Sequence, residues 1–374
     1  MNPRIGIIGF TNRLRGRGYS GAVPVAKNLA AELIAAGIGV DFLVFQTQPG
    51  RSLPFDLPDG ATIVDIDLND RTRAMVQVRQ YIVDVAPQGI MSTGTRGSNI
   101  LTTLKKSRVP FKAWISIHHP HSQEMKGWGF FRRYKRIRRL RAWASYADAI
   151  IAVSKMTRDD FIRVSRCDPD KIRVIYNPIV NSELKRLADE TIDHPWFTHL
   201  SEPVIISVGR LAAPKDFFTL LDSFNMVNRK MPCRLVILGE GPQRKLVENR
   251  IRELGLSERV QLRGFINNPF PFMKHSSLLV LSSAWEGTPN VLIEAMALGT
   301  PVVSTDCGGT KEVLGDGRYG PLVPPNNPQA LARAIISVLD NPPKPDLLRH
   351  GAQRFDATAA AKKYMEVMGL TQGN

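Results

Sequence analysis

The sequence predicts an α/β protein of two domains, each built on a largely parallel sheet. With 374 residues the chain is longer than a single ordinary hydrophobic core. Short apolar runs alternate along it with segments whose apolar residues recur at helical spacing, which is typical of strand–helix–strand units. The first run, residues 4–10, leads into a glycine-bearing loop and then a helix, as at the start of a doubly wound sheet.

The first domain continues this alternation, and we expect it to span residues 1–180. Ser154 follows an apolar run and precedes a helical pattern, so we expect its hydroxyl to cap that helix. Strands are predicted at 4–10, 40–45, 61–66, 89–92, 111–117, 148–153 and 172–176, with helices at 23–37, 71–85, 126–143 and after Ser154.

A polar stretch with prolines at its end, residues 181–202, is interpreted as a helix plus linker. A second α/β domain is expected at 203–345, and residues 346–374 are expected to form terminal helices. The predicted strands of this domain are 204–208, 235–238, 260–262, 278–281, 301–304 and 321–324, and its helices are 217–228, 291–298, 328–339 and 357–368.

Composition narrows the class of protein. A 43% share of hydrophobic residues with 22% charged residues indicates a folded chain. No apolar run reaches the roughly 18 residues of a membrane span, and the N-terminus MNPRIGIIGF lacks the pattern of a signal peptide. The cysteines, Cys167, Cys233 and Cys307, show neither metal-ligand spacing nor a disulfide framework. We therefore expect a cytoplasmic protein without a bound metal.

The formal net charge of +16 requires an anionic partner or surface. Its most concentrated source is Lys126–Trp143, which holds eight Lys or Arg residues and no acidic residue. Phe130, Tyr134 and Leu140 fall on one stripe of this predicted helix. We interpret it as a helix that lies on anionic lipid, through a basic set comprising Arg132, Arg133, Lys135, Arg136 and Arg139.

Two alternatives remain for this helix. It could pack on the core with a solvated basic face, because an apolar stripe alone does not distinguish core from membrane. Nucleic-acid binding is disfavoured, since the charge forms one block without a reading module.

Two segments point to ligand binding. His118 and His119 follow the strand 111–117, at the sheet edge where open α/β folds bind ligands, although partly exposed loop histidines would give the same pattern. In the second domain Gly209 and Arg210 directly follow a strand, and Lys215 lies five residues after Arg210. Two cations at a strand-to-helix turn suit a diphosphate, whereas isolated surface charge is the alternative.

The stretch AWEGTPNVLIEAMALGTP begins after the predicted strand 278–281 and becomes a helix that ends at Gly299. A helix N-terminus presents N–H groups and a positive dipole, so it attracts phosphate. Glu286 precedes this helix and Glu294 lies about one turn into it. Carboxylates beside an anion site suit the hydroxyls of a ribose or a sugar; the alternative is a loop glutamate and a helix-dipole partner.

Together, the Glu-x7-Glu spacing in EGTPNVLIEA, the following GTPVV, the pair Gly308–Gly309 and the segment GRLAAPKD resemble the retaining glycosyltransferases of GT-B fold, in the large family that includes sucrose synthases and lipid-linked sugar transferases. The resemblance implies two Rossmann-like domains that face each other, with a nucleotide-sugar bound by the second and the acceptor by the first. It also implies that the terminal helices, 346–374, cross back to the first domain.

The resemblance further assigns roles by position. Arg210 and Lys215 hold the donor diphosphate, Glu286 the sugar, and His118 contacts that sugar from the first domain. Where the family has Gly-Gly near the donor phosphates or the acceptor, this chain has Ser20–Gly21. The remaining expected donor contacts are Gly209, Gly264, Phe265 and Ile266 near the base, Thr288, Pro289, Asn290, Val291 and Leu292 at the helix start, and Glu294 at the ribose.

From these implications we expect a metal-independent, retaining hexosyltransferase that uses a nucleotide-sugar, with UDP the commoner base. The basic helix favours a lipid-linked or glycan acceptor of cell-envelope lipopolysaccharide or polysaccharide synthesis, reached from the inner face of the cytoplasmic membrane. Two alternatives stay open: a GT-B enzyme with a soluble acceptor, and a polyanion- or nucleic-acid-binding protein on an inactive scaffold. The sugar, linkage and oligomeric state are not specified by the sequence.

Overall fold

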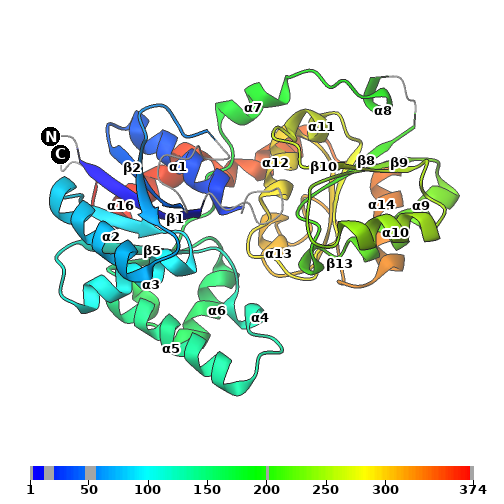
Figure 1. The fold of residues 1–374 in the computed structure, drawn as a ribbon. Helices are drawn as coiled ribbons and strands as arrows, with labels where there is room; N and C mark the ends of the chain where they lie inside the picture. Colours follow the sequence, from blue (N-terminus) through cyan, green and yellow to red (C-terminus); the bar gives the residue numbers. More distant parts are fainter. Residues whose placement is uncertain (1–2, 12–20, 47–55, 199–201, 371–374) are drawn as a thin grey trace. The chain divides into compact units, whose positions relative to one another are not determined.

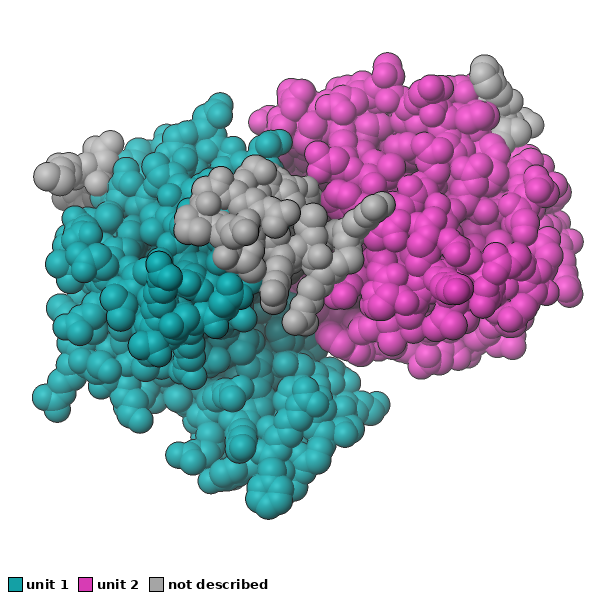
Figure 2. Space-filling model, viewed as in Figure 1, with its two compact units in different colours: residues 1–14, 19–178, 357–374 teal, residues 15–18, 179–356 magenta. Residues whose placement is uncertain are grey.

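The structure is a computed structural model that describes residues 3–11, 21–46, 56–198 and 202–370. The chain forms two compact units. Unit 1 contains residues 1–14, 19–178 and 357–374, and unit 2 contains residues 15–18 and 179–356 (Figure 2). Each unit holds its own parallel sheet with helices around it, so the predicted fold class of two parallel-sheet α/β domains is confirmed (Figure 1).

Unit 1 is built on a seven-stranded sheet in the order β3-β2-β1-β4-β5-β6-β7. All of its described strand pairs are parallel, for example Ile5 beside Val40 of β2 and beside Gly89 of β4. Its strands are β1 (Arg4–Thr11), β2 (Gly39–Gln46), β3 (Thr62–Asp67), β4 (Gly89–Ser92), β5 (Lys112–Ile117), β6 (Ala149–Ala152) and β7 (Ile172–Val174).

The helices of unit 1 cover both faces of this sheet. They are α1 (Ala22–Ala35), α2 (Arg71–Val85), α3 (Thr95–Lys106), α4 (His121–Glu124), α5 (Phe130–Tyr146), α6 (Lys155–Ser165), the short 3-10 turn Pro169–Lys171 and α16 (Ala357–Met368). Successive strand residues face opposite ways. Ile7 accordingly packs in the cluster that contains α1 and α16 residues, while Ile8 packs in the cluster that contains α2 and α3 residues.

Local signals begin several of these helices. Asp70 caps α2 by accepting from the N–H groups of Thr72 and Arg73. Ser154 accepts from the Thr157 N–H at 3.2 Å, so the expected cap of α6 is confirmed. Each cap satisfies N–H groups that the helix itself leaves without a partner.

Unit 2 is built on a six-stranded parallel sheet in the order β10-β9-β8-β11-β12-β13. The strands are β8 (Val204–Val208), β9 (Arg234–Leu238), β10 (Val260–Gly264), β11 (Leu278–Leu281), β12 (Val302–Thr305) and β13 (Leu322–Val323). Strand order runs outward from β8 to β10 and then resumes on the other side of β8 with β11. The neighbouring carboxyl ends of β8 and β11 therefore form the position at which such sheets bind ligands.

The helical elements of unit 2 are α7 (Ser182–Ala188), α8 (Pro195–Thr198), the 3-10 turns Ala213–Lys215 and Gln353–Phe355, α9 (Phe217–Lys230), α10 (Arg244–Glu253), α11 (Phe270–Lys274), α12 (Asn290–Leu298), α13 (Thr310–Val313), α14 (Pro328–Asp340) and α15 (Pro345–Ala352). Leu220, Phe224 and Leu331 are fully buried in their shared core. Gly299 ends α12 with a positive φ of 84°, as the helix-end signal predicts.

The stretch 181–202, which we interpret as a helix plus linker, begins with the helix α7. This helix contacts α11, and the Asn268 side chain, just before α11, donates to the Leu187 carbonyl at 2.8 Å. The terminal residues do not return to unit 1 as one block. α15 stays in unit 2, packed on α12, and only the residues from Ala357 onward join unit 1, where α16 packs on α1.

Candidate active site

The candidate active site of unit 2 lies where β8 and β11 end side by side. The two strands are paired, with Leu278 beside Ile205 and Leu279 beside Ile206. Gly209 and the exposed Arg210 follow β8, and the loop containing Glu286 follows β11. The predicted diphosphate-binding and sugar-binding residues, which come from two distant segments, thus lie together at the carboxyl ends of neighbouring strands.

Lys215 and Glu286 form an ion pair at this end of the sheet. The Lys215 ammonium Nζ lies 2.5 Å from Oε1 of Glu286, and the two side chains are 24% and 14% exposed. Ser283 donates a second hydrogen bond to the same oxygen at 2.7 Å. The Glu286 side chain is therefore held in one orientation by two neighbours.

The backbone on both sides of the pair is also fixed. The Ala284 N–H donates to the Pro214 carbonyl at 2.8 Å, and the Ser282 hydroxyl donates to the Lys215 carbonyl at 2.9 Å. The Glu286 N–H donates to the Cys307 carbonyl at 3.0 Å. Loops after β8, β11 and β12 are thereby joined into one frame around the ion pair.

Asp216 adds a strained position directly after Lys215. Its φ of 44° lies in the left-handed region, which costs a residue with a side chain roughly 1–2 kcal/mol. The Asp216 carboxylate offsets this cost by capping α9, since it accepts from the Thr219 N–H at 3.2 Å and from the Thr219 hydroxyl at 2.6 Å. The 3-10 turn therefore ends at Asp216, before α9 begins, and Lys215 contacts Glu286 from the end of that turn.

The N-terminus of α12 is the predicted phosphate position. Pro289 is its N-cap residue and provides no side-chain cap. Leu292 is among the donor contacts expected at the helix start, and its N–H donates to the Pro289 carbonyl at 3.2 Å. Leu292 is buried, whereas Thr288, Asn290 and Val291 are half-buried.

Glu294 lies one turn into α12 and is only 8% exposed. Burial raises the pKa of this carboxyl from its ordinary 4.5 to about 7. Near neutral pH the group therefore exists in both protonation states, as hydrogen-bond donor and as acceptor.

The predicted base-binding residues end the edge strand β10. Gly264 takes a positive φ of 77°, and its carbonyl accepts from the Gly239 N–H at 2.7 Å. Phe265 is 38% exposed and Ile266 is half-buried. These three residues lie two strands away from β8, across β9.

The remaining predicted site residues belong to unit 1. Ser20 lies outside the described residues, and Gly21 is the N-cap residue of α1. His118 is half-buried at the end of β5, and its Nε2 lies 3.0 Å from the Ser116 hydroxyl. Burial, assisted by His119, lowers the pKa of His118 to about 4, so the ring is neutral at physiological pH.

The basic helix α5 corrects one expectation. Arg136 was expected on the lipid-facing side, but it is 4% exposed, and its Nη2 lies 2.8 Å from Oε2 of Glu124 on α4. A buried guanidinium with a carboxylate partner is not available to a membrane. Arg132, Arg133, Lys135 and Arg139 are exposed.

The predicted apolar stripe of α5 divides into two parts. Leu140 and Ala144 are buried in the core of unit 1. Phe130, Phe131 and Tyr134 at the other end are 75%, 78% and 49% exposed. We call Phe130, Phe131, Tyr134 and the exposed cations Arg132, Arg133 and Lys135 the α5 surface. Aromatic rings among cations are typical of helices that lie in a lipid interface.

Sequence reasoning missed the partners of these groups. The hydrogen bond from Ser283 to Glu286 could have been predicted, because Ser283 lies only three residues before Glu286 in the sequence. The cluster of His119, His121 and Glu124 around Arg136 was not detectable, since α4 is a four-residue helix without a pattern. These His and Glu ligand atoms lie within 4.8 Å of one another, but the Arg136 guanidinium already contacts Glu124 and lies 3.2 Å from Nδ1 of His121.

Comparison with known proteins agrees with this architecture. The profile of Glycosyltransferase Family 4 matches residues 19–182, and that of Glycosyl transferases group 1 matches residues 189–355. Among solved structures, a sucrose-phosphate synthase from Thermosynechococcus elongatus superposes with a TM-score of 0.82 at 22% identity, covering 99% of this chain and 100% of that chain. The Anabaena protein HepE, in complex with UDP and glucose, gives 0.76 at 19% identity, with 99% and 100% covered.

Curated relatives match over shorter segments. A Campylobacter jejuni N-acetylgalactosamine-N,N'-diacetylbacillosaminyl-diphospho-undecaprenol 4-alpha-N-acetylgalactosaminyltransferase is 33% identical over 222 residues, 59% of this chain and 57% of its own length. A lipopolysaccharide core biosynthesis glycosyltransferase of Rhizobium meliloti is 30% identical over 203 residues, 53% and 58% of the two chains. The chain spans about half the length of the curated relatives it matches.

The two parallel-sheet units, the ion pair where β8 and β11 end, and the matching profiles define the class of protein. This chain belongs to the glycosyltransferases of GT-B fold.

Proposed function

We propose that this protein transfers a sugar from a nucleotide-sugar, taken to be a UDP-sugar, to an acceptor hydroxyl with retention of anomeric configuration. The observation that carries the proposal is the Lys215–Glu286 pair, which fixes a cation and a hydroxyl acceptor beside the N-terminus of α12. HepE, which shares the fold, was solved with UDP and glucose, and this supports the choice of uridine.

In this proposal the leaving diphosphate lies between the α12 N-terminus and the two cations. Negative charge accumulates on the leaving diphosphate oxygen as the bond to the sugar breaks, and cations already in position stabilise that charge without reorganising. The Lys215 ammonium has three N–H donors, so it can retain Glu286 and still bind a phosphate oxygen. Arg210 is exposed at the end of β8 and adds a planar donor pair.

The carboxylates orient the two sugars of the donor. Glu286 has one oxygen occupied by Lys215 and Ser283, and we assign its other oxygen to the hydroxyls of the transferred sugar. Glu294 would accept from the ribose hydroxyls, and the backbone at Gly264, Phe265 and Ile266 would receive the base. We assign to His118 a contact with the transferred sugar, and to Ser20–Gly21 a contact with the donor phosphates or acceptor.

The reaction balances without a further reactant. The bond between the anomeric carbon and the diphosphate oxygen breaks, and that oxygen keeps the electron pair. The acceptor oxygen bonds to the same carbon from the same face, and its proton passes to the departing diphosphate. Because two cations neutralise the leaving group, we propose that the step needs no metal.

We extend the proposal to a lipid-linked or glycan acceptor at the inner face of the cytoplasmic membrane. The α5 surface supports this, since exposed rings beside cations bind anionic lipid interfaces. The printed name of the Campylobacter relative includes a diphospho-undecaprenol acceptor. Among the residues that the structure describes, no helix has the length and apolar character needed to cross a membrane.

The test is release of nucleoside diphosphate from UDP-, GDP- and ADP-sugars, with and without a bacterial lipid extract. We expect turnover with one UDP-sugar, stimulation by lipid, and loss of turnover in Glu286→Gln. Glu253→Gln, an exposed carboxylate at the end of α10, is the matched control. Turnover independent of lipid would assign a soluble acceptor, and no donor turnover with tight oligonucleotide binding would support the polyanion alternative.

A further inference from the structure

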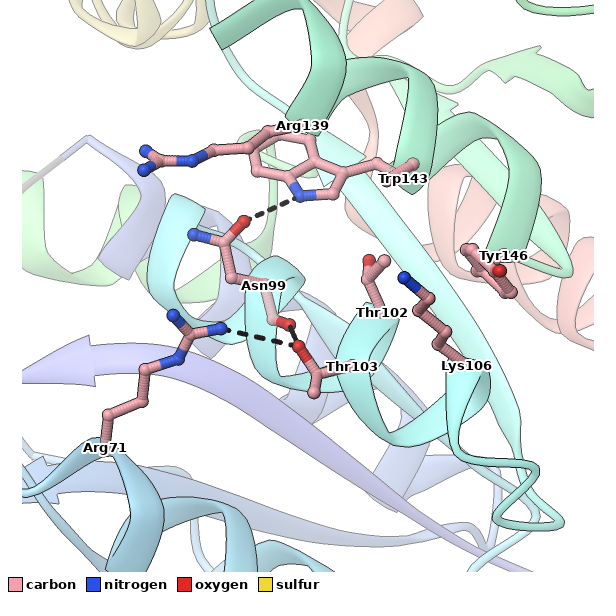
Figure 3. A pocket seen from close by; sticks show the side chains of 9 residues that line it. Arg71, Asn99, Thr102, Thr103, Lys106, Arg139, Trp143 and Tyr146 are labelled. Atoms are coloured by element: carbon pink, nitrogen blue, oxygen red, sulfur yellow. Dashed lines mark hydrogen bonds between the residues drawn. The ribbon is translucent and has the colours of Figure 1, made fainter. Parts of the chain in front are cut away.

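Unit 1 contains a cavity of about 300 Å³ between α2, α3 and α5. It is separate from the residues assigned to the donor, which with the exception of Ser20, Gly21 and His118 lie in unit 2. The volume is at the lower end of the range for small-molecule pockets, so the cavity suits a compact group. Figure 3 shows the side chains that line it.

The charges around this cavity are all positive. Arg71 at the start of α2, Lys106 at the end of α3 and Arg139 on α5 line it, and no acidic residue does. Within the described part of the chain, none of these three cations forms an ion pair with a carboxylate. In Figure 3 the Arg71 and Arg139 guanidinium groups lie on the Asn99 side, and Lys106 lies near Tyr146. Arg71, Lys106 and Arg139 are all exposed, and three like charges around one cavity repel one another unless an anion lies between them.

The wall of the cavity supplies further polar groups. Thr102 lines the cavity and is 9% exposed, and among the residues that the structure describes its hydroxyl has no hydrogen-bond partner. A buried hydroxyl without a partner costs roughly as much as a lost hydrogen bond, so it calls for a ligand atom. Asn99 accepts from the Trp143 indole N–H at 3.0 Å, which fixes the orientation of its amide.

We propose that this cavity is a phosphate-binding site distinct from the donor site. Phosphate oxygens accept hydrogen bonds and carry negative charge, which matches the ammonium of Lys106, the guanidinium groups of Arg71 and Arg139, and the hydroxyl of Thr102. A neutral sugar would leave the cations unpaired, and a carboxylate would reach fewer of the donors.

The phosphate has two possible sources, a lipid headgroup or a soluble phosphate ester. Arg139 belongs to the same helix as the exposed Phe130 but lies on the opposite face of it, since nine residues are two and a half helical turns. The position of Arg139 therefore favours neither source, and the experiment separates the two.

Trp143 gives a local readout, because it lines the cavity and its indole N–H bonds to Asn99. Protein labelled with ¹⁵N in its tryptophan side chains is titrated with inorganic phosphate and, separately, with dihexanoyl phosphatidic acid below its micelle concentration. Ionic strength is held constant, and Trp143→Phe assigns the signal. We expect a saturable shift of the Trp143 signal, with the tighter probe identifying the source.

Two variants test the assignment of donors. Arg71→Gln/Lys106→Gln should raise the half-saturating probe concentration about tenfold, because two charge-assisted bonds are lost. Thr102→Val, which keeps side-chain shape, should raise it several-fold. The control Arg79→Gln/Lys363→Gln removes the same charge from exposed positions outside the cavity and should leave it unchanged.

No Trp143 shift with either probe, or equal weakening in the control and cavity variants, would overturn the proposal. Since the cavity does not include Arg210, Lys215 or Glu286, its failure would leave donor turnover unaffected. The proposed transferase activity and the proposed phosphate site can therefore each be refuted without affecting the other.

Discussion

The Lys215 ammonium lies 2.5 Å from the Glu286 carboxylate, although 71 positions separate the two residues in the sequence. The contact joins the loop after β8 to the loop after β11, where the strand order of unit 2 turns back. Each residue thereby positions the other for a different part of the proposed donor, the ammonium for the diphosphate and the carboxylate for the sugar.

The first prediction concerns this pair. Lys215→Ala should lower kcat for the UDP-sugar by about 10²–10³-fold, the loss typical of one preorganised donor to a developing negative charge. KM should change less, because the charge is greatest in the transition state. Lys230→Ala, an exposed lysine at the end of α9, is the control, and equal losses in both variants would argue against a direct role for Lys215.

The second prediction concerns the close packing of two loops of the site, at Gly309 and Gly287. A Cβ added at Gly309 would lie 1.7 Å from the carbonyl oxygen of Gly287, so one of the two loops must move. Gly309→Ala should reduce turnover at least about tenfold and lower the melting temperature by several degrees. Gly129→Ala, where an added Cβ meets nothing within 4 Å, should do neither. Normal turnover in Gly309→Ala would show that the frame tolerates displacement.

The third prediction concerns Glu294 and the stability of unit 2. Its pKa rises from 4.5 to about 7 on folding, so between these values the folded state binds more protons than the unfolded state. The free energy of unfolding should therefore fall as pH rises through this window, by up to about 3 kcal/mol from this group. Glu294→Gln should remove that slope in denaturant unfolding between pH 5 and pH 8; an unchanged slope would contradict the burial argument.

The fourth prediction gives unit 1 the opposite pH dependence. Burial, outweighing the hydrogen bond to Glu124 and aided by the charges of His119 and Arg136, lowers the pKa of His121 from 6.5 to about 4. The unfolded state then binds more protons between these values, so stability is lost as pH falls from 6.5 toward 4. His121→Gln should flatten this loss. The measurement is the unfolding midpoint of unit 1 against pH, and a variant as acid-sensitive as wild type would refute it.

The fifth prediction concerns the α5 surface. Phe130→Ser/Phe131→Ser should reduce flotation with vesicles of anionic phospholipid about tenfold or more, since burying each ring contributes about 1.5–3 kcal/mol. Val76→Ser/Val83→Ser removes exposed apolar side chains from α2 and is the control, because these residues are 61% and 68% exposed. Arg132→Glu/Arg133→Glu should also weaken binding, and more so at low salt.

Much of the fold could be predicted because local patterns determine it. The strand before Gly209 is apolar except for Ser207. Gly299 marks a helix end because glycine readily takes the positive φ that this position requires. The contact between Lys215 and Glu286 was harder to predict from the sequence. The sequence pointed to each residue separately, but strand order decides that β8 and β11 are neighbours.

The errors came from contacts that lack a local pattern. Arg136 is one of eight Lys or Arg residues in the basic block, so the sequence does not distinguish it from the others. Only the fold shows that Arg136 contacts Glu124 and Thr95. The position of α15 also depends on packing: it contacts α12, and Arg349 closes over Gly299. Charge density and helix periodicity cannot report such partners.

The return of α16 to unit 1 has a consequence for synthesis on the ribosome. Ala361, Tyr364 and Met368 complete the core that begins with Ile5 and Ile7 of β1. Until residues 357–368 have emerged, the apolar face that β1 shares with α1 is only partly covered, while residues 179–356 of unit 2 are already present. The core of unit 2 can thus form before that of unit 1 is complete, and the exposed apolar face favours aggregation in the interval.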